Sequence, residues 1–328
     1  MLKTHLNELS VKDFMKSLMS GTLEESVIES YVLALNEKGL SAEDIFDAAL
    51  VMRQFSKAVH IHDKTHLVDT CGTGGDGIQT FNVSTLSAIV AASAGVKVAK
   101  HGGRSVSSKC GSADVLEALG VNVDLTPERA AALVDEIGIA FMFAPNFHPA
   151  MRYAAPVRKK LGVRTIFNVL GPLANPALAT HQVLGVYEAS LTKMMAEALL
   201  KLGSQHVMVV HGDDGMDEIS ISSPTTITEL KHKIISTYAI KPTDFGFEMA
   251  SLETIQVKDA DASKAMILDV LKGNYGPHRD IILLNAGAAI YVGGITNSLK
   301  EGIEKAAQAI DQGLAFNTLE ALKVASHG

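Results

Sequence analysis

The sequence has few cysteines, no long hydrophobic run and no excess of positive charge, and each shortage excludes a class of protein. Its two cysteines, Cys71 and Cys110, cannot form a disulfide framework or a four-ligand zinc site, so we expect a reduced, cytoplasmic protein. No apolar run reaches the ~18 residues of a transmembrane helix, and the N-terminal residues lack the apolar core of a signal peptide. A net charge of −7 gives no general attraction to nucleic acid or membranes, so any phosphate must be bound locally.

The length and composition predict a well-packed globular protein with two domains or one large α/β domain. The chain has 328 residues, of which 47% are hydrophobic and 20% are charged. The N-terminal 65 residues predict a small helical domain, because apolar residues recur there three or four positions apart. Each of its helices is expected to begin at a Ser or Thr followed three residues later by an acid: Ser10 with Asp13, Thr22 with Glu25, and Ser41 with Asp44.

From residue 66 onward, short apolar strands alternate with helices, which predicts a mostly parallel central sheet covered on both faces. Residues 225–240 alternate between polar and apolar and predict an antiparallel pair, and residues 281–294 predict a buried helix. The segment at about 150–176 has no strand pattern and is expected to return to the helical domain. The large α/β domain would then consist of residues 66–149 and 177–328.

The loop after the first predicted strand is rich in glycine. Its composition favours an anion-binding site, because glycines let the backbone point several N–H groups at one anion. Ser84 and Thr85 follow where a helix begins, so the helix N-terminus would face the same place. The loop lacks the Gly-Lys-Ser/Thr ending of a nucleotide P-loop and does not fit the dinucleotide pattern G-x-G-x-x-G. The glycines concerned are Gly72, Gly74, Gly75 and Gly77.

A second loop, after the next strand, concentrates basic and hydroxyl side chains in an otherwise acidic protein. Such a loop suits a di- or triphosphate, although a solvated surface loop would have the same composition. Its members are Lys100, Arg104, Ser105, Ser107, Ser108, Lys109 and Ser112.

Two further stretches carry functional signals. At the end of a later apolar strand, residues 211–218 hold several acids, which favour a hard cation such as magnesium beside substrate phosphates. Residues 145–176 place arginines among rigid Gly-Pro and Asn-Pro turns. This second stretch is either a hinge between domains or an acceptor pocket in which an arginine meets a carboxylate.

Taken together, these four stretches resemble the anthranilate phosphoribosyltransferase family, and they occur in the family's order between residues 69 and 218. The resemblance implies a nucleoside-phosphorylase-like fold with a small helical domain and a large α/β domain, and a homodimer formed through the helical domain. It also implies transfer of the phosphoribosyl group from 5-phosphoribosyl 1-pyrophosphate to anthranilate. The products are N-(5′-phosphoribosyl)anthranilate and pyrophosphate, in tryptophan biosynthesis, with magnesium as cofactor and no nucleic-acid or membrane partner.

The resemblance also assigns residues to each ligand. Lys100 would stabilise the leaving pyrophosphate, and no covalent nucleophile is expected, because the anthranilate amine is already neutral at pH 7. For magnesium the implied ligands are Ser84, Asp217 and Glu218. For anthranilate they are Gly72, His101, Gly103, His148 and Arg158. For phosphoribosyl pyrophosphate they are Gly72, Gly75, Asp76, Thr80, Asn82, Val83, Ser84, Thr85, Lys100, His101, Gly102, Gly103, Arg104, Ser105, Val106, Ser107, Ser108 and Ser112.

One position departs from the family pattern, and two other functions share parts of it. Gly103 stands where the family normally has an asparagine whose amide would help to bind anthranilate. A pyrimidine nucleoside phosphorylase has the same architecture but uses free phosphate, and it has no need of the acidic pair Asp217 and Glu218. A non-catalytic member that binds nucleic acid should carry a basic face, which the net charge of −7 disfavours.

Overall fold

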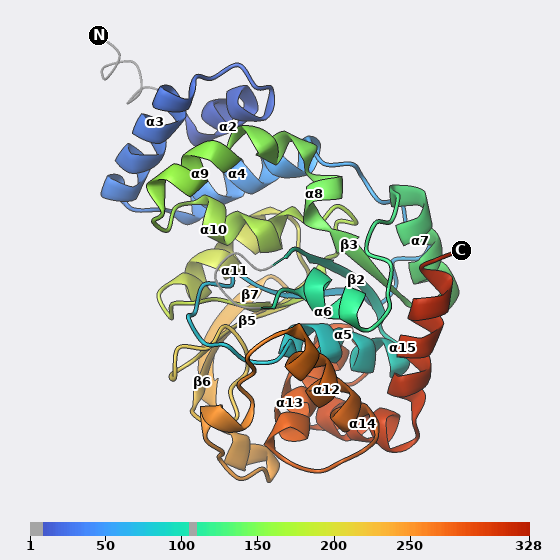
Figure 1. Ribbon diagram of the computed structural model, residues 1–328. Coiled ribbons are helices and arrows are strands. Elements are labelled where there is room, and N and C mark those ends of the chain that lie inside the picture. Colours follow the sequence, from blue (N-terminus) through green and yellow to red (C-terminus); the bar gives the residue numbers. More distant parts are fainter. Residues whose placement is uncertain (1–8, 105–109) are drawn as a thin grey trace.

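A seven-stranded sheet forms the centre of the molecule in the computed structural model, which describes residues 9–104 and 110–328 (Figure 1). The first five strands in the order across the sheet are parallel, and the last two pair antiparallel, as predicted. That order is β3 (Ile139–Phe143), β2 (Lys97–Gly102), β1 (Leu67–Gly72), β4 (His181–Gly185), β5 (His206–Gly212), β6 (Thr225–Lys231) and β7 (Ile234–Ile240).

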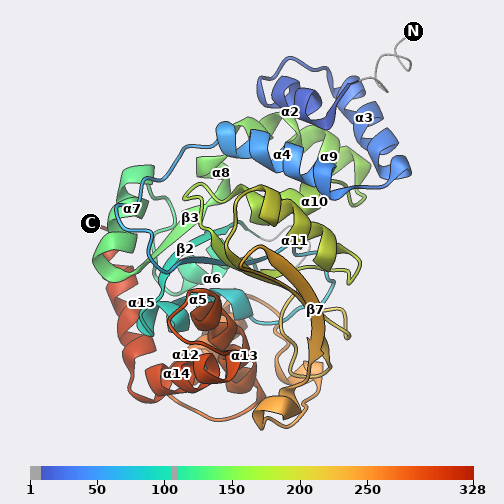
Figure 2. The same ribbon diagram turned by 180° about the vertical axis from the view of Figure 1, so that it is seen from behind.

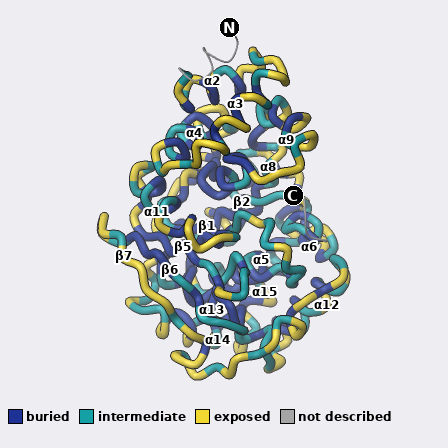
Figure 3. The backbone as a smooth tube through the Cα atoms, turned by 90° about the vertical axis from the view of Figure 1, so that its left-hand side faces the viewer, coloured by how far each residue is buried: buried dark blue, intermediate teal, exposed yellow. Residues whose placement is uncertain are grey.

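Helices cover both faces of the sheet, which is why its parallel strands are apolar on both sides. The parallel strands β1 to β5 are mostly buried, whereas the edge strand β7 is largely exposed (Figure 3). One face of the sheet is covered by α11 (Leu191–Lys201), which contacts β5, β6 and β7 (Figure 2). The other helices of the large layer contribute side chains to the larger hydrophobic cluster, on the other face of the sheet. They are α5 (Val83–Ser93), α6 (Ser112–Ala118), α7 (Pro127–Ile137), α12 (Ala260–Leu271), α13 (Pro277–Val292), α14 (Leu299–Asp311) and α15 (Leu314–Ala325).

The helix predicted to be buried is α13, and it packs closely on α14 through two glycines. A Cβ atom added to Gly302 would lie 2.2 Å from the carbonyl oxygen of Gly287. One added to Gly287 would lie 2.7 Å from the backbone nitrogen of Ile303. The two helix backbones therefore touch directly, and no larger residue fits at their crossing.

The N-terminal helices are α2 (Val11–Met19), α3 (Glu25–Lys38) and α4 (Ala42–Gln54). The hydroxyls of Ser10 and Ser41 cap the first and third of them, as predicted. The predicted cap at Thr22 is wrong, because its hydroxyl donates to the Ser17 carbonyl of the preceding helix, and α3 begins after Glu24. The turn at Gly21, with φ +71°, directs Thr22 back toward the helix before it.

A second hydrophobic cluster joins the N-terminal helices to a segment more than a hundred residues later. Phe14 and Ile45 from the early helices share it with Val157 and Ile166, and it continues to Leu199 of α11 beside the sheet. The later segment comprises η1 (Pro149–Tyr153), α9 (Ala155–Leu161), α10 (Phe167–Leu170) and η2 (Gly171–Ala174), preceded by α8 (Ala144–Phe147). None of the helices within residues 9–104 and 110–328 has the length and apolar character needed to cross a lipid bilayer.

Candidate active site

Four strand ends bring the predicted loops to one edge of the sheet, where ligands bind in open parallel sheets. β1, β2 and β4 end at Gly72, Gly102 and Gly185, and the acidic turn follows β5. A Cβ atom added to Gly72 would lie 2.2 Å from Oδ2 of Asp217. The absence of a side chain at Gly72 therefore lets the glycine loop pack directly against the acidic turn.

The glycine loop points backbone amides toward the acidic turn. Gly74, Gly75 and Gly77 have φ values of +64°, +76° and +78°, in the region that favours glycine. The Gly74 amide donates to Oδ2 of Asp217 at 2.7 Å. One amide of the glycine loop therefore points to the acidic turn, and anion binding by the loop stays a prediction.

The three residues predicted to hold magnesium lie together, although Ser84 is more than 130 positions from the other two. The backbone N–H of Ser84, in the first turn of α5, donates to Oε1 of Glu218 at 3.1 Å, and Asp217 is adjacent in sequence. Burial raises the pKa of Asp217, and burial with repulsion from Asp217 raises the pKa of Glu218 well above its usual value. Burial and the Asp217 charge also raise the pKa of Asp76 to about 7.

This concentration of carboxylates fits a divalent cation. Repulsion among Asp76, Asp217 and Glu218 would be relieved by a positive ion, and carboxylate and hydroxyl oxygens are the ligands that magnesium prefers. In the part of the chain that the structure describes, no three His, Cys, Asp or Glu residues are arranged to hold a metal. A magnesium ion here would therefore take its remaining ligands from water and substrate phosphates, as magnesium commonly does.

Lys100 lies at the bottom of this site with its side chain buried at 3% exposure. Its ammonium donates to the Thr70 carbonyl at 2.5 Å and to Oγ of Ser84 at 3.2 Å. Burial lowers the pKa of Lys100, and the nearby charge of Asp69 opposes that shift. Asp69 is itself fully buried and accepts from the backbone N–H of His101 at 3.2 Å. The sequence motifs assign no role to Asp69, although a carboxylate within an apolar strand itself indicates a special function.

Two histidines predicted near the acceptor contact each other. The rings of His101 and His148 form an edge-on pair with centroids 5.0 Å apart. Burial lowers the pKa of His101 to about 3 and that of His148 to about 4, so both rings are neutral at pH 7. Nε2 of each ring is buried without a hydrogen-bond partner among the described residues. An unpaired buried nitrogen is a site where a substrate donor would gain a bond.

Arg158 in α9 is a partly buried cation whose guanidinium N–H groups can bind a ligand. Its guanidinium lies over the Phe167 ring, 5.8 Å from the centroid. Within residues 9–104 and 110–328, no carboxylate pairs with it, and burial lowers its pKa. A ligand carboxylate would supply the missing partner.

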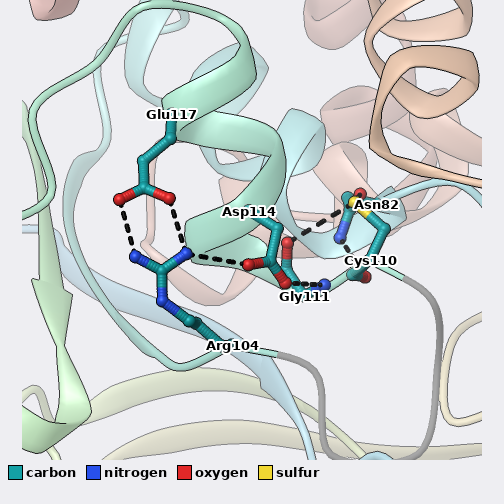
Figure 4. Close-up of polar contacts among 6 residues, drawn as sticks. All are labelled: Asn82, Arg104, Cys110, Gly111, Asp114 and Glu117. Carbon is teal, nitrogen blue, oxygen red and sulfur yellow. Dashed lines mark hydrogen bonds and ion pairs between the residues drawn. The ribbon is translucent and has the colours of Figure 1, made fainter.

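The second loop is described only at its two ends. Its Arg104 forms ion pairs with Asp114 at 2.9 Å and with Glu117 at 2.6 Å, so its guanidinium is held by α6 (Figure 4). Gly103 lacks a positive φ, and none of the described residues has an atom within 4 Å of a Cβ added there. Predicted residues Ser105, Val106, Ser107 and Ser108 lie outside the described residues.

Other residues predicted to bind phosphoribosyl pyrophosphate make hydrogen bonds that hold the loops in place. Oγ1 of Thr85 donates to Oγ of Ser112 at 3.1 Å, which joins the starts of α5 and α6. Nδ2 of Asn82 donates to the Cys110 carbonyl at 3.1 Å, and Asn82 also bonds Ser263 of α12. Of the remaining members, Thr80 forms a bridge to Gln256, Val83 begins α5 and Gly102 ends β2.

Comparison with known proteins places the chain among relatives of one kind. Residues 64–316 match the family described as "Glycosyl transferase family, a/b domain". The chain is 54% identical to an anthranilate phosphoribosyltransferase of Nitrosomonas europaea, covering 94% of this chain and 91% of that protein. It is 55% identical to that of Thiobacillus denitrificans, with 94% and 90% covered.

Solved structures agree with the sequence comparison. The crystal structure of anthranilate phosphoribosyltransferase from Thermus thermophilus has a TM-score of 0.93 and 40% identity, with 100% of this chain and 99% of that chain covered. The enzyme from Saccharomyces cerevisiae, solved with phosphoribosyl pyrophosphate and magnesium, has a TM-score of 0.88 and 31% identity, with 98% and 94% covered. The overall fold of those proteins is the fold described above.

Proposed function

The chain belongs to the anthranilate phosphoribosyltransferase family, and we propose that its two substrates and magnesium bind at the carboxyl edge of the sheet. The protein is a pentosyltransferase of tryptophan biosynthesis. It transfers the phosphoribosyl group of 5-phosphoribosyl 1-pyrophosphate to anthranilate, giving N-(5′-phosphoribosyl)anthranilate and pyrophosphate, and it uses magnesium. The assignment of residues to these ligands is supported chiefly by the meeting of Ser84, Lys100 and Glu218 at one point.

The donor would lie between the glycine loop and the N-terminus of α5. Amides of the loop and of the first turn of α5 converge there, and such amides bind phosphate without adding net charge. Lys100 adds the positive charge, and its position beside Ser84 places it next to the proposed metal. Arg104 could join only by giving up its ion pairs with Asp114 and Glu117.

Anthranilate would bind on the side of Arg158, His101 and His148. The guanidinium of Arg158 suits the carboxylate of anthranilate, because a planar fork of donors matches two carboxylate oxygens. The neutral histidines have unpaired Nε2 atoms that accept hydrogen bonds, and an aromatic amine is a suitable donor to them.

The chemistry requires stabilisation of charge more than proton transfer. As the bond between ribose C1 and the pyrophosphate oxygen breaks, negative charge grows on the leaving group, and Lys100 with the loop amides stabilises it there. Magnesium, when bound through Ser84, Asp217 and Glu218, supplies further positive charge to the same oxygens. The anthranilate nitrogen attacks ribose C1 with its own lone pair as the bond to pyrophosphate breaks. The aryl ammonium so formed is acidic and releases its proton to water, so the residues on the acceptor side need only orient the amine.

We also propose how the chain is divided and assembled. Residues 1–65 with about 150–176 would form the small helical domain, and residues 66–149 and 177–328 the large domain. Two copies would associate through the helical domain, where Leu33 of α3 and Phe55 after α4 expose apolar side chains. A cytoplasmic location would suit a biosynthetic enzyme whose Cys71 thiol is buried and free. Light scattering at several concentrations tests the dimer, and a monomeric mass throughout would contradict it.

One assay tests the activity. The purified protein is incubated with anthranilate, phosphoribosyl pyrophosphate and magnesium while the loss of anthranilate fluorescence is followed. We expect turnover that requires all three components. No turnover at saturating substrates would contradict the assignment. Phosphorolysis of thymidine would support a nucleoside phosphorylase instead, and salt-sensitive retention on DNA would support a nucleic-acid-binding protein.

A further inference from the structure

Arg164 connects the segment between α9 and α10 to the glycine loop. Its Nη2 donates to the carbonyl oxygen of Gly75. Its guanidinium also lies on the ring of Tyr187, 4.0 Å from the centroid. The sequence assigns no role to Arg164 or to Tyr187, and the hydrogen bond joins residues 89 positions apart.

The stacking partner of Arg164 is itself attached to the glycine loop. The backbone N–H of Tyr187, which follows β4, donates to Oγ1 of Thr73 at 3.2 Å. The backbone N–H of Thr73 in turn donates to the Gly185 carbonyl at 2.9 Å. Arg164 therefore contacts the loop in two ways, directly at Gly75 and through the aromatic ring fixed beside Thr73.

The backbone of Arg164 is held from the opposite direction by the N-terminal helices. Nδ2 of Asn36, in α3, donates to the Arg164 carbonyl at 2.8 Å. A single residue thus links α3, the segment after α9 and the glycine loop. Movement of the N-terminal helices relative to the sheet would be transmitted to Gly75 through this residue.

The hydrogen bond from Arg164 to the Gly75 carbonyl determines the direction of the Asp76 N–H. In a trans peptide the C=O and N–H groups point in opposite directions, so a carbonyl held toward Arg164 turns the Asp76 N–H away from it. Among the described residues, the Gly75 carbonyl has no other hydrogen-bond partner, and Gly74 and Gly75 are in conformations that glycine leaves easily. The Asp76 carboxylate is held separately, by the Ile78 N–H at 3.0 Å. The Gly74 N–H already points to Asp217, on the side of the acidic turn.

We propose that Arg164 is a positioning residue that fixes the Gly75–Asp76 peptide with its amide available to the phosphoribosyl pyrophosphate. This inference rests on the proposed placement of that donor on the glycine loop. Arg164 acts through backbone geometry and does not itself bind the substrate. Both its charge and its planar, two-sided shape are needed, because one face lies on Tyr187 while one nitrogen donates to Gly75.

The test compares three variants of the full-length protein. Arg164→Met removes the donor and the charge, and Arg164→Lys keeps the charge but loses the planar fork. Arg152→Met is the matched control, because Arg152 is also exposed, lies in the same segment and stacks on a tyrosine, its neighbour Tyr153, at 4.8 Å. Arg152 donates to the hydroxyl of that same tyrosine, and among the described residues it makes no hydrogen bond to the glycine loop.

The measurements separate positioning from general stability and from direct binding. We expect both Arg164 variants to raise the donor KM about tenfold, with the anthranilate KM changed less than twofold and the melting temperature within about two degrees of wild type. Hydrogen–deuterium exchange at residues 74–78 should become faster in both variants without substrate, and Arg152→Met should match wild type. Unchanged exchange in Arg164→Met, or wild-type exchange and donor KM in Arg164→Lys, would overturn the proposal.

A separate measurement distinguishes failure of this inference from failure of the site assignment. Phosphoribosyl pyrophosphate with magnesium is added to the wild-type protein, and exchange at residues 74–78 is compared with and without it. Slower exchange at these residues when the donor is added to wild type supports the donor site, and the variants then decide the role of Arg164. If exchange there is unaffected by the donor, the assignment of the loop is wrong, and the role of Arg164 in donor binding falls with it.

Discussion

At the scale of single residues, Asp217 and Glu218 are expected to matter for turnover far more than for stability. Repulsion between them opposes folding, so Asp217→Asn with Glu218→Gln should leave the melting temperature unchanged or slightly higher. Loss of metal stabilisation of the leaving group should cost on the order of several kcal/mol of activation free energy. Activity across a magnesium titration checks this, and wild-type rates in the double variant would refute the metal role.

Arg158 is expected to serve the acceptor alone. Arg158→Ala should raise the anthranilate KM about ten- to a hundredfold, equivalent to roughly 1.5–3 kcal/mol for a charged hydrogen bond. Its guanidinium has no ion-pair partner among the described residues, so stability should change little. Initial rates with each substrate varied in turn show which substrate Arg158 binds. A change in the donor KM alone would assign Arg158 to the phosphate site instead.

Gly103 is the position where the chain departs from the family's usual asparagine. A positive φ does not explain the glycine, because Gly103 lacks one, and no atom of residues 9–104 or 110–328 lies within 4 Å of an added Cβ. Asparagine should therefore fit without strain. We expect Gly103→Asn to improve kcat/KM for anthranilate about five- to tenfold, near the ~1 kcal/mol of one hydrogen bond. An anthranilate KM that stays at the wild-type value would reject the missing-donor account.

At the scale of secondary-structure elements, the crossing of α13 and α14 leaves no room for a side chain at Gly302. A methyl group at Gly302 would force the helices apart, since its nearest atom is the backbone oxygen of Gly287 at 2.2 Å. Gly302→Ala should lower the free energy of unfolding by about 3 kcal/mol, the upper range for overpacking. Urea unfolding measures this. Gln308→Ala, exposed on the same helix, is the control and should change it by less than about 0.5 kcal/mol.

The sequence predicted these elements well because their signals are local. Hydrophobic periodicity located β1–β5 and the buried α13, and serine caps located the starts of α2 and α4. The cap at Thr22 failed because the motif does not specify which way the hydroxyl points. The bond from Arg164 to Gly75 depends on how distant segments meet, and no local pattern contains that information.

At the scale of the whole molecule, the buried histidines make stability depend on pH. His101 and His148 have folded pKa values of about 3 and about 4, below the ~6.5 of an unfolded histidine. The unfolded chain therefore takes up protons first as the pH falls. The stability that these neutral rings contribute is fully present above about pH 6.5 and is lost between that pH and about 3–4.

Two variants check that prediction. The melting temperature should fall from pH 7 to pH 5, and His148→Gln should fall less steeply because its amide does not titrate. His60→Gln provides the control, since His60 is exposed and its replacement should leave the slope as in wild type. Equal slopes in all three proteins would show that other groups determine the acid sensitivity.

The second hydrophobic cluster also has a consequence for synthesis of the chain on the ribosome. Its early members lie in α2–α4, whereas its later members, such as Val157, Ile166 and Leu199, are translated about a hundred or more residues afterwards. At roughly 5–20 residues per second, the apolar faces of α2–α4 wait on the order of ten seconds for their partners. During that interval these faces are available to chaperones or to a neighbouring nascent chain. The N-terminal helices thus emerge first but finish packing only after more than half of the protein has been made.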